Sequence, residues 1–212
     1  MKKMTLKSDY VSKVYSHKII FQHVTFSVSQ DSSFAITGKN GSGKSTLIKI
    51  LCGLLTPTKG SVSLVVEDKA LKPENYYPHI GLVSPYLNLY DEFTGEENLT
   101  LIRKIRGLHS DVSSRAINLL KEFNIYDHRK KEVRFYSSGM KQRLKYCAAL
   151  LHEPSVLYLD EPTANLDEMG ISIVKDVMKR QKKLGALVFA TNEHDDLKFA
   201  DSVLNLDELD KG

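Results

Sequence analysis

A glycine-rich run that ends in a lysine and a serine is the strongest chemical signal in the sequence. It reads Gly38-Lys39-Asn40-Gly41-Ser42-Gly43-Lys44-Ser45 and fits the pattern G-x-x-x-x-G-K-[ST]. Glycines allow backbone N–H groups to turn inward around phosphate oxygens, and a helix N-terminus adds favourable potential for negative charge. Lys44 would contact the β- and γ-phosphates, and the Ser45 hydroxyl would bind Mg²⁺. The run therefore predicts a site for a nucleotide and its magnesium ion.

A second signal is an apolar run that ends in two carboxylates, Val156-Leu157-Tyr158-Leu159-Asp160-Glu161. Uninterrupted apolar residues are typical of a parallel strand covered on both faces, and open α/β sheets bind ligands at the carboxyl ends of such strands. Asp160 would hold Mg²⁺ directly or through water, and Glu161 would orient or deprotonate an attacking water. Alone the run is also compatible with a solvated strand end. Beside the phosphate-binding run it indicates hydrolysis of a nucleotide, with Lys44 and Glu161 as catalytic residues.

A third signal is a group of small residues at the predicted start of a helix, Ser137-Ser138-Gly139-Met140. Small residues at a helix N-terminus can bind an anion through backbone N–H groups. An ordinary serine N-cap, which stabilises a helix by about 1 kcal/mol, would show the same letters. Taken alone the segment favours the N-cap.

The elements that must position these residues can be predicted from hydrophobic periodicity. Alternation or apolar runs predict strands near 24–28, 34–36, 62–66, 80–83, 156–159, 186–190 and 203–206. Helical spacing predicts helices near 44–55, 99–106, 116–123, 140–151 and 171–178. The mostly helical stretch lies between strands, so we expect a helical subdomain inserted into an α/β core.

Length and composition favour one globular domain. The chain has 212 residues, of which 42% are hydrophobic and 26% charged, which is ordinary for globular proteins and argues against disorder. The net charge of +4 supplies no basic stripe, so we expect no nucleic-acid partner. Cys52 and Cys147 lack the spacing of zinc ligands, so we expect both to be buried apolar residues in a reducing compartment. No apolar run is long enough to span a membrane, and the basic start shows no signal peptide.

Taken in order, the motifs make the chain similar to the ATP-binding subunit of an ABC transporter, from about Leu6 to Leu206. Gly38 to Thr46 resembles Walker A, Val156 to Glu161 resembles Walker B, Ser137 to Met140 resembles the signature motif, and Thr163 to Asp167 resembles the D-loop. Tyr15 matches the aromatic residue that stacks on adenine in the family, although alone it is compatible with a surface or core tyrosine.

The resemblance implies a P-loop NTPase core with a mixed sheet, an antiparallel β subdomain and an inserted helical subdomain. The chain would be one ABC ATPase domain, 1–212, with its core near 1–90 and 152–212 and its helical subdomain near 91–151. The cofactors would be ATP and Mg²⁺. The resemblance places ATP contacts at the residues of the Walker A run and at Tyr15, Ser137, Ser138, Gly139, Asp167 and Asn192.

A head-to-tail dimer, with a second identical or different ABC subunit, would hold each ATP between two copies. Ser137 and Gly139 would then contact the γ-phosphate bound to the other copy. ATP would close the dimer and hydrolysis would release it, which would drive an integral membrane permease subunit. Such a subunit is cytoplasmic and peripheral on the inner face of the cell membrane. The signature region leans towards exporters, and the surface around 86–97 would receive the partner's cytoplasmic helix.

Three positions depart from the family. Pro85 stands where a glutamine normally reaches Mg²⁺ and the water; Ser84 has a hydroxyl but a shorter reach. The signature's first glycine is Ser138. Asn192 stands where a switch histidine is usual, and His194 is either its displaced replacement or a surface residue. We expect hydrolysis to survive, because the lysine, the serine and both carboxylates described above are present.

Two alternatives stay open. One is a soluble ABC ATPase that acts outside transport, although such relatives typically carry two cassettes or a long coiled coil, and 85–137 is too short for that coil. The other is a slow or degenerate cassette that binds ATP and scaffolds a complex, which the residues at 85 and 192 favour.

Overall fold

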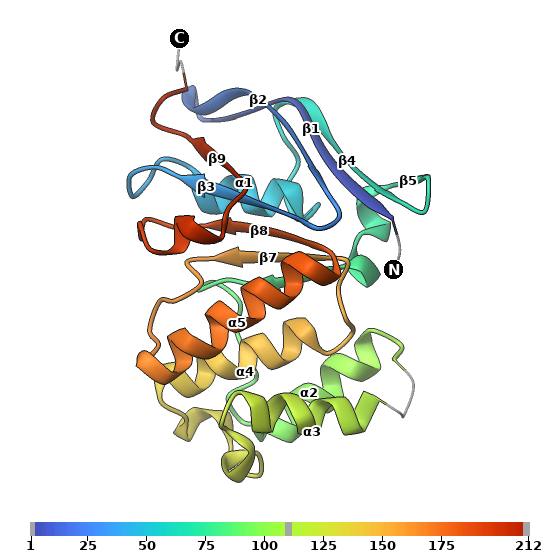
Figure 1. Cartoon of the computed structure of the whole chain (residues 1–212), viewed down its shortest axis with the longest axis vertical. Helices are drawn as coiled ribbons and strands as arrows, with labels where there is room; N and C mark the ends of the chain where they lie inside the picture. The colour runs from blue at the N-terminus through green and yellow to red at the C-terminus, as the bar shows by residue number, and fades with distance from the viewer. Residues whose placement is uncertain (1–2, 109–111, 210–212) are drawn as a thin grey trace.

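The computed structural model describes residues 3–108 and 112–209. Figure 1 shows an antiparallel sheet at the top, a parallel sheet in the middle and most of the helices below it. Helix α1 (Lys44–Leu51) is the exception, because it lies between the two sheets. This layered arrangement confirms the α/β fold class.

The parallel sheet forms the centre of the molecule. Its strands follow the order β6 (Ile80–Val83), β7 (Val156–Asp160), β8 (Ala186–Ala190), β3 (Ser32–Thr37) and β9 (Ser202–Asn205). The strand pairs recorded for this sheet are all parallel within the described ranges. β7 and β8 are buried along their whole length, because other elements cover both faces of the sheet.

The antiparallel sheet has the order β2 (Lys18–Ser29), β1 (Met4–Tyr15), β4 (Lys59–Val66) and β5 (Lys69–Leu71). On β2 the predicted alternation is confirmed, since Val24 and Val28 are buried while Thr25 is exposed. The antiparallel β subdomain that the resemblance implies is therefore present as a separate sheet, and the core sheet, expected to be mixed, is parallel in the pairs described above. Strands with one apolar face pair antiparallel over α1, and strands that are apolar on both faces form the parallel sheet.

Strand β1 is an element that the hydrophobic pattern does not predict. Two of its inward positions are serines, Ser8 and Ser12, which are buried. The Ser8 hydroxyl donates to the Val24 carbonyl at 2.8 Å, so its burial leaves no unpaired hydroxyl donor. Register shifts interrupt the pairing with β2, and they also break the alternation by which a strand is recognised.

In the described part of the chain, four helices cover the face of the parallel sheet that points away from α1 and the antiparallel sheet. They are α2 (Gly95–Ile105), α3 (Val112–Glu122), α4 (Ser138–Leu150) and α5 (Glu168–Leu184). Short 3₁₀ turns span Pro73–Asn75, Tyr77–His79, Tyr126–His128, Val133–Phe135 and Asp196–Phe199. Helix α1 ends earlier than its periodicity predicts: Cys52 caps it and Gly53 follows with a φ of 73°. Helices α2 to α4 fall within the range expected for the helical subdomain, and the division into core and subdomain stays a prediction.

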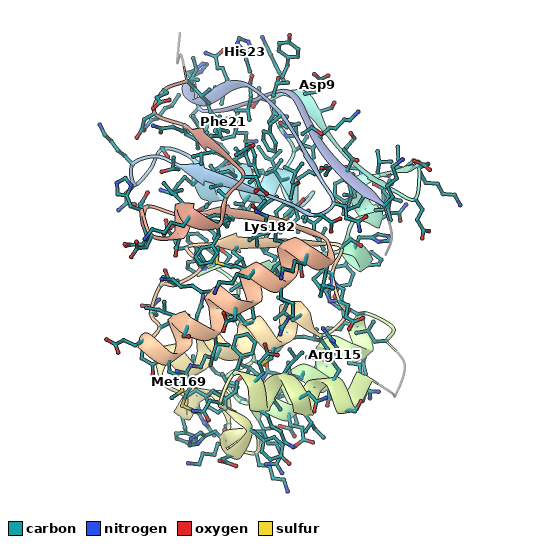
Figure 2. The ribbon with its side chains drawn as sticks, in the orientation of Figure 1. Asp9, Phe21, His23, Arg115, Met169 and Lys182 are labelled. Carbon is teal, nitrogen blue, oxygen red and sulfur yellow. The ribbon has the colours of Figure 1, made fainter. Side chains whose placement is uncertain are left out.

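The parallel sheet separates two apolar cores. Val156 and Tyr158 of β7 face the core that holds α1 and the antiparallel sheet, whereas Leu157 and Leu159 face the core under α2 to α5. Phe21 on β2 is fully buried, while Met169 at the start of α5 is exposed (Figure 2).

Both cysteines, Cys52 and Cys147, are buried and free, as predicted. Among the described residues, no helix combines the length and apolarity needed to span a membrane.

Candidate active site

The glycine-rich run forms a loop between β3 and the N-terminus of α1. Gly43, the residue before the helix, has a φ of 109°, in the left-handed region that glycine tolerates. A Cβ atom there would lie 2.5 Å from Cγ2 of Ile20 on β2. The loop is thus pressed against the antiparallel sheet, and only glycine fits at this contact.

Lys44 is the central cation of the site and is nearly buried, with 6% of its surface exposed. Its Nζ donates to the carbonyl oxygens of Gly38 at 2.8 Å and Lys39 at 3.3 Å. Nζ also lies 3.8 Å from Oε1 of Glu161. The lysine from the loop and the glutamate that follows β7, both expected in the site, are therefore brought together.

Asn192, two residues after β8, also contacts the site. Its Oδ1 accepts from Nζ of Lys44 at 2.9 Å, and its Nδ2 donates to Oδ1 of Asn40 at 2.7 Å. The side chain thus bridges the lysine and the rim of the phosphate-binding loop. His194 is exposed and is not among the residues that line the cavity described below.

Asp160 ends β7 and is 2% exposed. Its Oδ2 accepts from the Ser84 hydroxyl at 3.3 Å, and its buried Oδ1 has no hydrogen-bond partner in the described part of the chain. An orphaned carboxylate oxygen at a phosphate site fits a divalent cation with oxygen ligands. Ser45 lines the same cavity, so the Ser45 hydroxyl and the Asp160 carboxylate suit Mg²⁺.

Glu161 follows β7 in a strained backbone conformation, with a φ of 55°. Its N–H donates to the Ala190 carbonyl at 2.9 Å, which anchors it beside β8. Burial raises the pKa of its carboxyl; Lys44 partly offsets this effect, and the Asp160 carboxylate raises the pKa further. A carboxylate with a raised pKa is suited to accept a proton from water.

Lys44, Asp160 and Glu161 border a cavity of about 390 Å³. Its lining residues are Ile20, Asn40, Gly41, Gly43, Lys44, Ser45, Thr46, Pro85, Tyr86, Asp160 and Glu161. The sequence does not assign Ile20, since an apolar residue on a strand gives no signal of a binding role. From the sequence, Tyr86 is predicted only as part of the surface that would receive the membrane partner's helix.

Tyr15 is not among the lining residues of this cavity. It ends β1 and is 45% exposed, with Nζ of Lys13 4.8 Å from the centre of its ring. Its stacking on adenine stays a prediction.

The signature residues also lie outside this cavity. Ser137 caps α4, because its hydroxyl accepts from the Met140 N–H at 3.2 Å. Ser137 and Ser138 are exposed, and a Cβ atom on Gly139 would lie 3.2 Å from the Asn165 carbonyl. The signature segment therefore faces solvent beside the D-loop.

Asp167 links the D-loop to the signature helix. It caps α5 by accepting from the Gly170 N–H at 2.8 Å, and it forms an ion pair with Arg143 of α4. The backbone hydrogen bond, followed by the bond from the guanidinium, lowers the pKa of this exposed carboxyl. The side chain of Arg143 is only 8% exposed, so Asp167 is the counter-ion of a nearly buried cation.

The fold and the site define a P-loop NTPase in which a helical segment is inserted between the phosphate loop and the strand with the two carboxylates. The family model of the ABC transporter matches residues 21–164. Since this match covers more than half of the chain, the chain belongs to the ABC transporter family, as a nucleotide-binding domain.

Three curated relatives illustrate the similarity. The uncharacterized ABC transporter ATP-binding protein YxlF of Bacillus subtilis is 35% identical over 94% of this chain. The linearmycin resistance ATP-binding protein LnrL of Bacillus subtilis is 31% identical and the bacitracin transport ATP-binding protein BcrA of Bacillus licheniformis 33% identical, each over 89% of this chain. The chain spans 66%, 61% and 61% of the lengths of these relatives.

Solved structures agree with this assignment. An ATP-binding subunit of an ABC transporter superposes with a TM-score of 0.85 at 31% identity, over 98% of this chain and 86% of that one. A dimeric ATP-binding cassette bound to ADP and phosphate has a TM-score of 0.83 at 22% identity, over 98% of this chain and 95% of that one. The second likeness shows the fold alone.

Proposed function

We propose that the chain is the ATP-binding and ATP-hydrolysing motor subunit of an ABC transporter, and that it drives a separate integral membrane subunit. The observation that carries the proposal is the convergence of Lys44, Asp160 and Glu161 on one cavity. A phosphate-binding cation, a carboxylate with a free oxygen and a proton acceptor are the groups that hydrolysis of a phosphoanhydride requires.

The roles follow from these positions. Backbone N–H groups of the 38–46 loop and Lys44 would bind the phosphates. The Ser45 hydroxyl and Asp160 would hold Mg²⁺, which when bound neutralises charge on the phosphate oxygens. Glu161 would orient the attacking water and take its proton, and Asn192 would donate its amide N–H to the γ-phosphate.

A second ABC subunit, identical or different, would complete each site. The exposed Ser137 and Ser138 and the adjoining Gly139 support this part of the proposal, because they lie outside their own chain's cavity. In a head-to-tail dimer they would face the γ-phosphate bound to the other copy. Asp167 would then lie at the interface, beside the signature segment that Arg143 connects to it.

The membrane partner would dock on the loop that follows β6. Tyr86, Tyr90 and Phe93 are exposed there by 65%, 53% and 40%, and the rings of Tyr90 and Phe93 stack with centres 5.4 Å apart. Exposed aromatic residues of this kind mark interaction surfaces. Since Tyr86 also lines the cavity, the loop would connect the nucleotide site to the membrane partner.

The names of the relatives favour an exporter. The subunit would then be cytoplasmic and peripheral on the inner face of the membrane.

A nucleotide-gated scaffold is the second candidate. The observation that favours it is the hydrogen bond by which Asn192 holds Lys44, in a site where Pro85 lacks a side-chain amide. Such a subunit would bind ATP and close with its partner, but turn over slowly.

The test is a pull-down from detergent-solubilised membranes, followed by an assay of the complex for Mg²⁺-dependent ATP turnover. The Lys44→Ala variant serves as the inactive control. A membrane partner with turnover that this variant lacks would support the motor. A partner without turnover would favour the scaffold, and turnover without any partner would favour a soluble ATPase outside transport.

A further inference from the structure

Ser84 is the side chain that the loop after β6 directs at the cation site. It is 4% exposed, and its hydroxyl donates to Oδ2 of Asp160 at 3.3 Å. The Ser84 hydroxyl oxygen also accepts a hydrogen bond from the Tyr86 N–H at 3.4 Å. The next residue, Pro85, lines the cavity but has neither an N–H group nor a polar side chain. Ser84 is thus the polar side chain that this loop brings to Asp160.

The lone pairs at the contact between Ser84 and Asp160 are only partly engaged in hydrogen bonds. A hydroxyl oxygen has two lone pairs, and one of them accepts the Tyr86 N–H. Oδ1 of Asp160 is buried and has no partner within the described ranges. One hydroxyl lone pair and one carboxylate oxygen therefore remain available together, and both are the hard oxygen ligands that Mg²⁺ and Mn²⁺ prefer.

Two lysines of the signature helix α4 hold this loop in place. Nζ of Lys145 donates to the carbonyl oxygens of Ser84 and Pro85, both at 3.3 Å. One helical turn away, Nζ of Lys141 binds Oδ1 of Asp91 at 2.8 Å. Residues four apart share a helix face, so α4 contacts the loop at two points. Of these two lysines, Lys145 binds beside Ser84 and Lys141 binds farther along the loop.

We propose that the Ser84 hydroxyl joins Asp160 in holding the divalent cation of bound ATP, where the family uses a glutamine amide one residue later, and that Lys145 positions it. The inference rests on the proposed function. It also makes Lys145 a link between the signature helix and the cation site of the same subunit, because a shift of α4 would displace the two carbonyl groups that it holds.

The test uses Mn²⁺ as the probe, with the full chain saturated with a non-hydrolysable ATP analogue. Bound Mn²⁺ is counted from the loss of the free-ion EPR signal, with the analogue alone as blank. Ser84→Ala is expected to weaken Mn²⁺ binding about tenfold, as loss of a group beside a metal ligand typically does. Ser84→Thr keeps the hydroxyl and is expected to bind Mn²⁺ far more tightly than Ser84→Ala. Metal-free binding of a fluorescent ATP analogue should be the same in both.

Lys145→Ala should weaken Mn²⁺ binding in the same direction, and Lys145→Arg should restore it, because arginine can still donate to two carbonyl groups. Lys141→Ala is the matched control and should bind Mn²⁺ like the unmodified chain. Wild-type Mn²⁺ affinity in Ser84→Ala would overturn the role of Ser84, and equal losses in the two lysine variants would overturn the positioning by Lys145. Failure of the unmodified chain to bind the metal-free analogue would instead overturn the proposed function.

Discussion

The ammonium group of Lys44 lies 2.9 Å from Oδ1 of Asn192, so a residue two positions after β8 directly holds the lysine of the phosphate-binding loop. The amide of Asn192 also donates to Asn40. One side chain therefore couples the end of a core strand to two points of the loop. An amide can exchange these bonds for bonds to a phosphate, but it cannot donate or accept a proton as an acid or base.

Replacing Asn192 by alanine should reduce ATP turnover by about tenfold or more, since a hydrogen bond to a charged group contributes roughly 1.5–3 kcal/mol. Affinity for ATP should change less, because the loop backbone and Lys44 remain. Measurement of kcat and of the ATP dissociation constant separates the two effects. His194→Ala is the matched control and should leave turnover unchanged. The reverse order of effects would identify His194 as the switch residue.

Glu161→Gln should trap an ATP-bound dimer. The amide keeps the shape of the side chain but cannot accept a proton from water, and loss of a general base typically costs 10²–10⁴-fold in rate. Turnover and the mass of the particle in ATP, from light scattering, check the two halves of this prediction. Wild-type hydrolysis by the variant would refute the role assigned to Glu161.

Glu161 should also make stability depend on pH. Burial raises the pKa of its carboxyl in the folded chain. Between the ordinary carboxyl pKa and this raised value the folded state binds more protons than the unfolded state, so the free energy of unfolding falls as pH rises. Glu161→Gln removes the free-energy cost of keeping an ionised carboxylate in this partly buried position. The nucleotide-free variant should melt at a higher temperature than the unmodified chain at pH 7.5, and the difference should shrink near pH 4. A difference that is constant with pH would argue against a buried, ionised Glu161.

Asp167 should stabilise the fold with the opposite dependence on pH. The Gly170 N–H and the Arg143 guanidinium lower its pKa, so its contribution is complete above the ordinary carboxyl pKa and is lost as pH falls through the lowered value. Asp167→Asn keeps an acceptor for Gly170 but leaves the nearly buried Arg143 without its counter-ion. It should lower the melting temperature at pH 7, and less so in acid. The neighbouring Glu168→Gln is the control, and an equal loss there would show a general charge effect on α5.

The parts of the fold that the sequence predicts are those in which a local pattern has a local cause. The apolar run before Asp160 is a buried strand, and the loop before Lys44 needs glycine at Gly43 because its φ of 109° lies in the left-handed region. Strand β1 escapes prediction because the partner of its buried Ser8 is a carbonyl group on another strand. Nothing local to Ser8 records that partner.

The functional site likewise combines residues that the sequence predicts with contacts that it does not predict. The residues that define the phosphate site follow from spacing along the chain. The contact of Ser84 with Asp160 spans 76 positions and that of Lys145 with Ser84 spans 61, so tertiary packing alone produces them. The departure at Pro85 is visible in the sequence, but its consequence for Asp160 requires the distances.

Tyr15 offers the remaining test of the nucleotide site. Stacking of an aromatic ring on a base contributes about 0.5–1.5 kcal/mol beyond area burial, so Tyr15→Ala should weaken ATP binding by roughly 2- to 12-fold. Tyr15→Phe keeps the ring and should bind ATP like the unmodified chain. Tyr10→Ala is the matched control, because Tyr10 lies on the same strand and is 64% exposed. Titration with a fluorescent adenine nucleotide measures all three. Equal affinities of Tyr15→Ala and Tyr10→Ala would place adenine elsewhere, and a second titration with a nucleotide of a different base would then show whether the loop and Lys44 bind the phosphates without regard to the base.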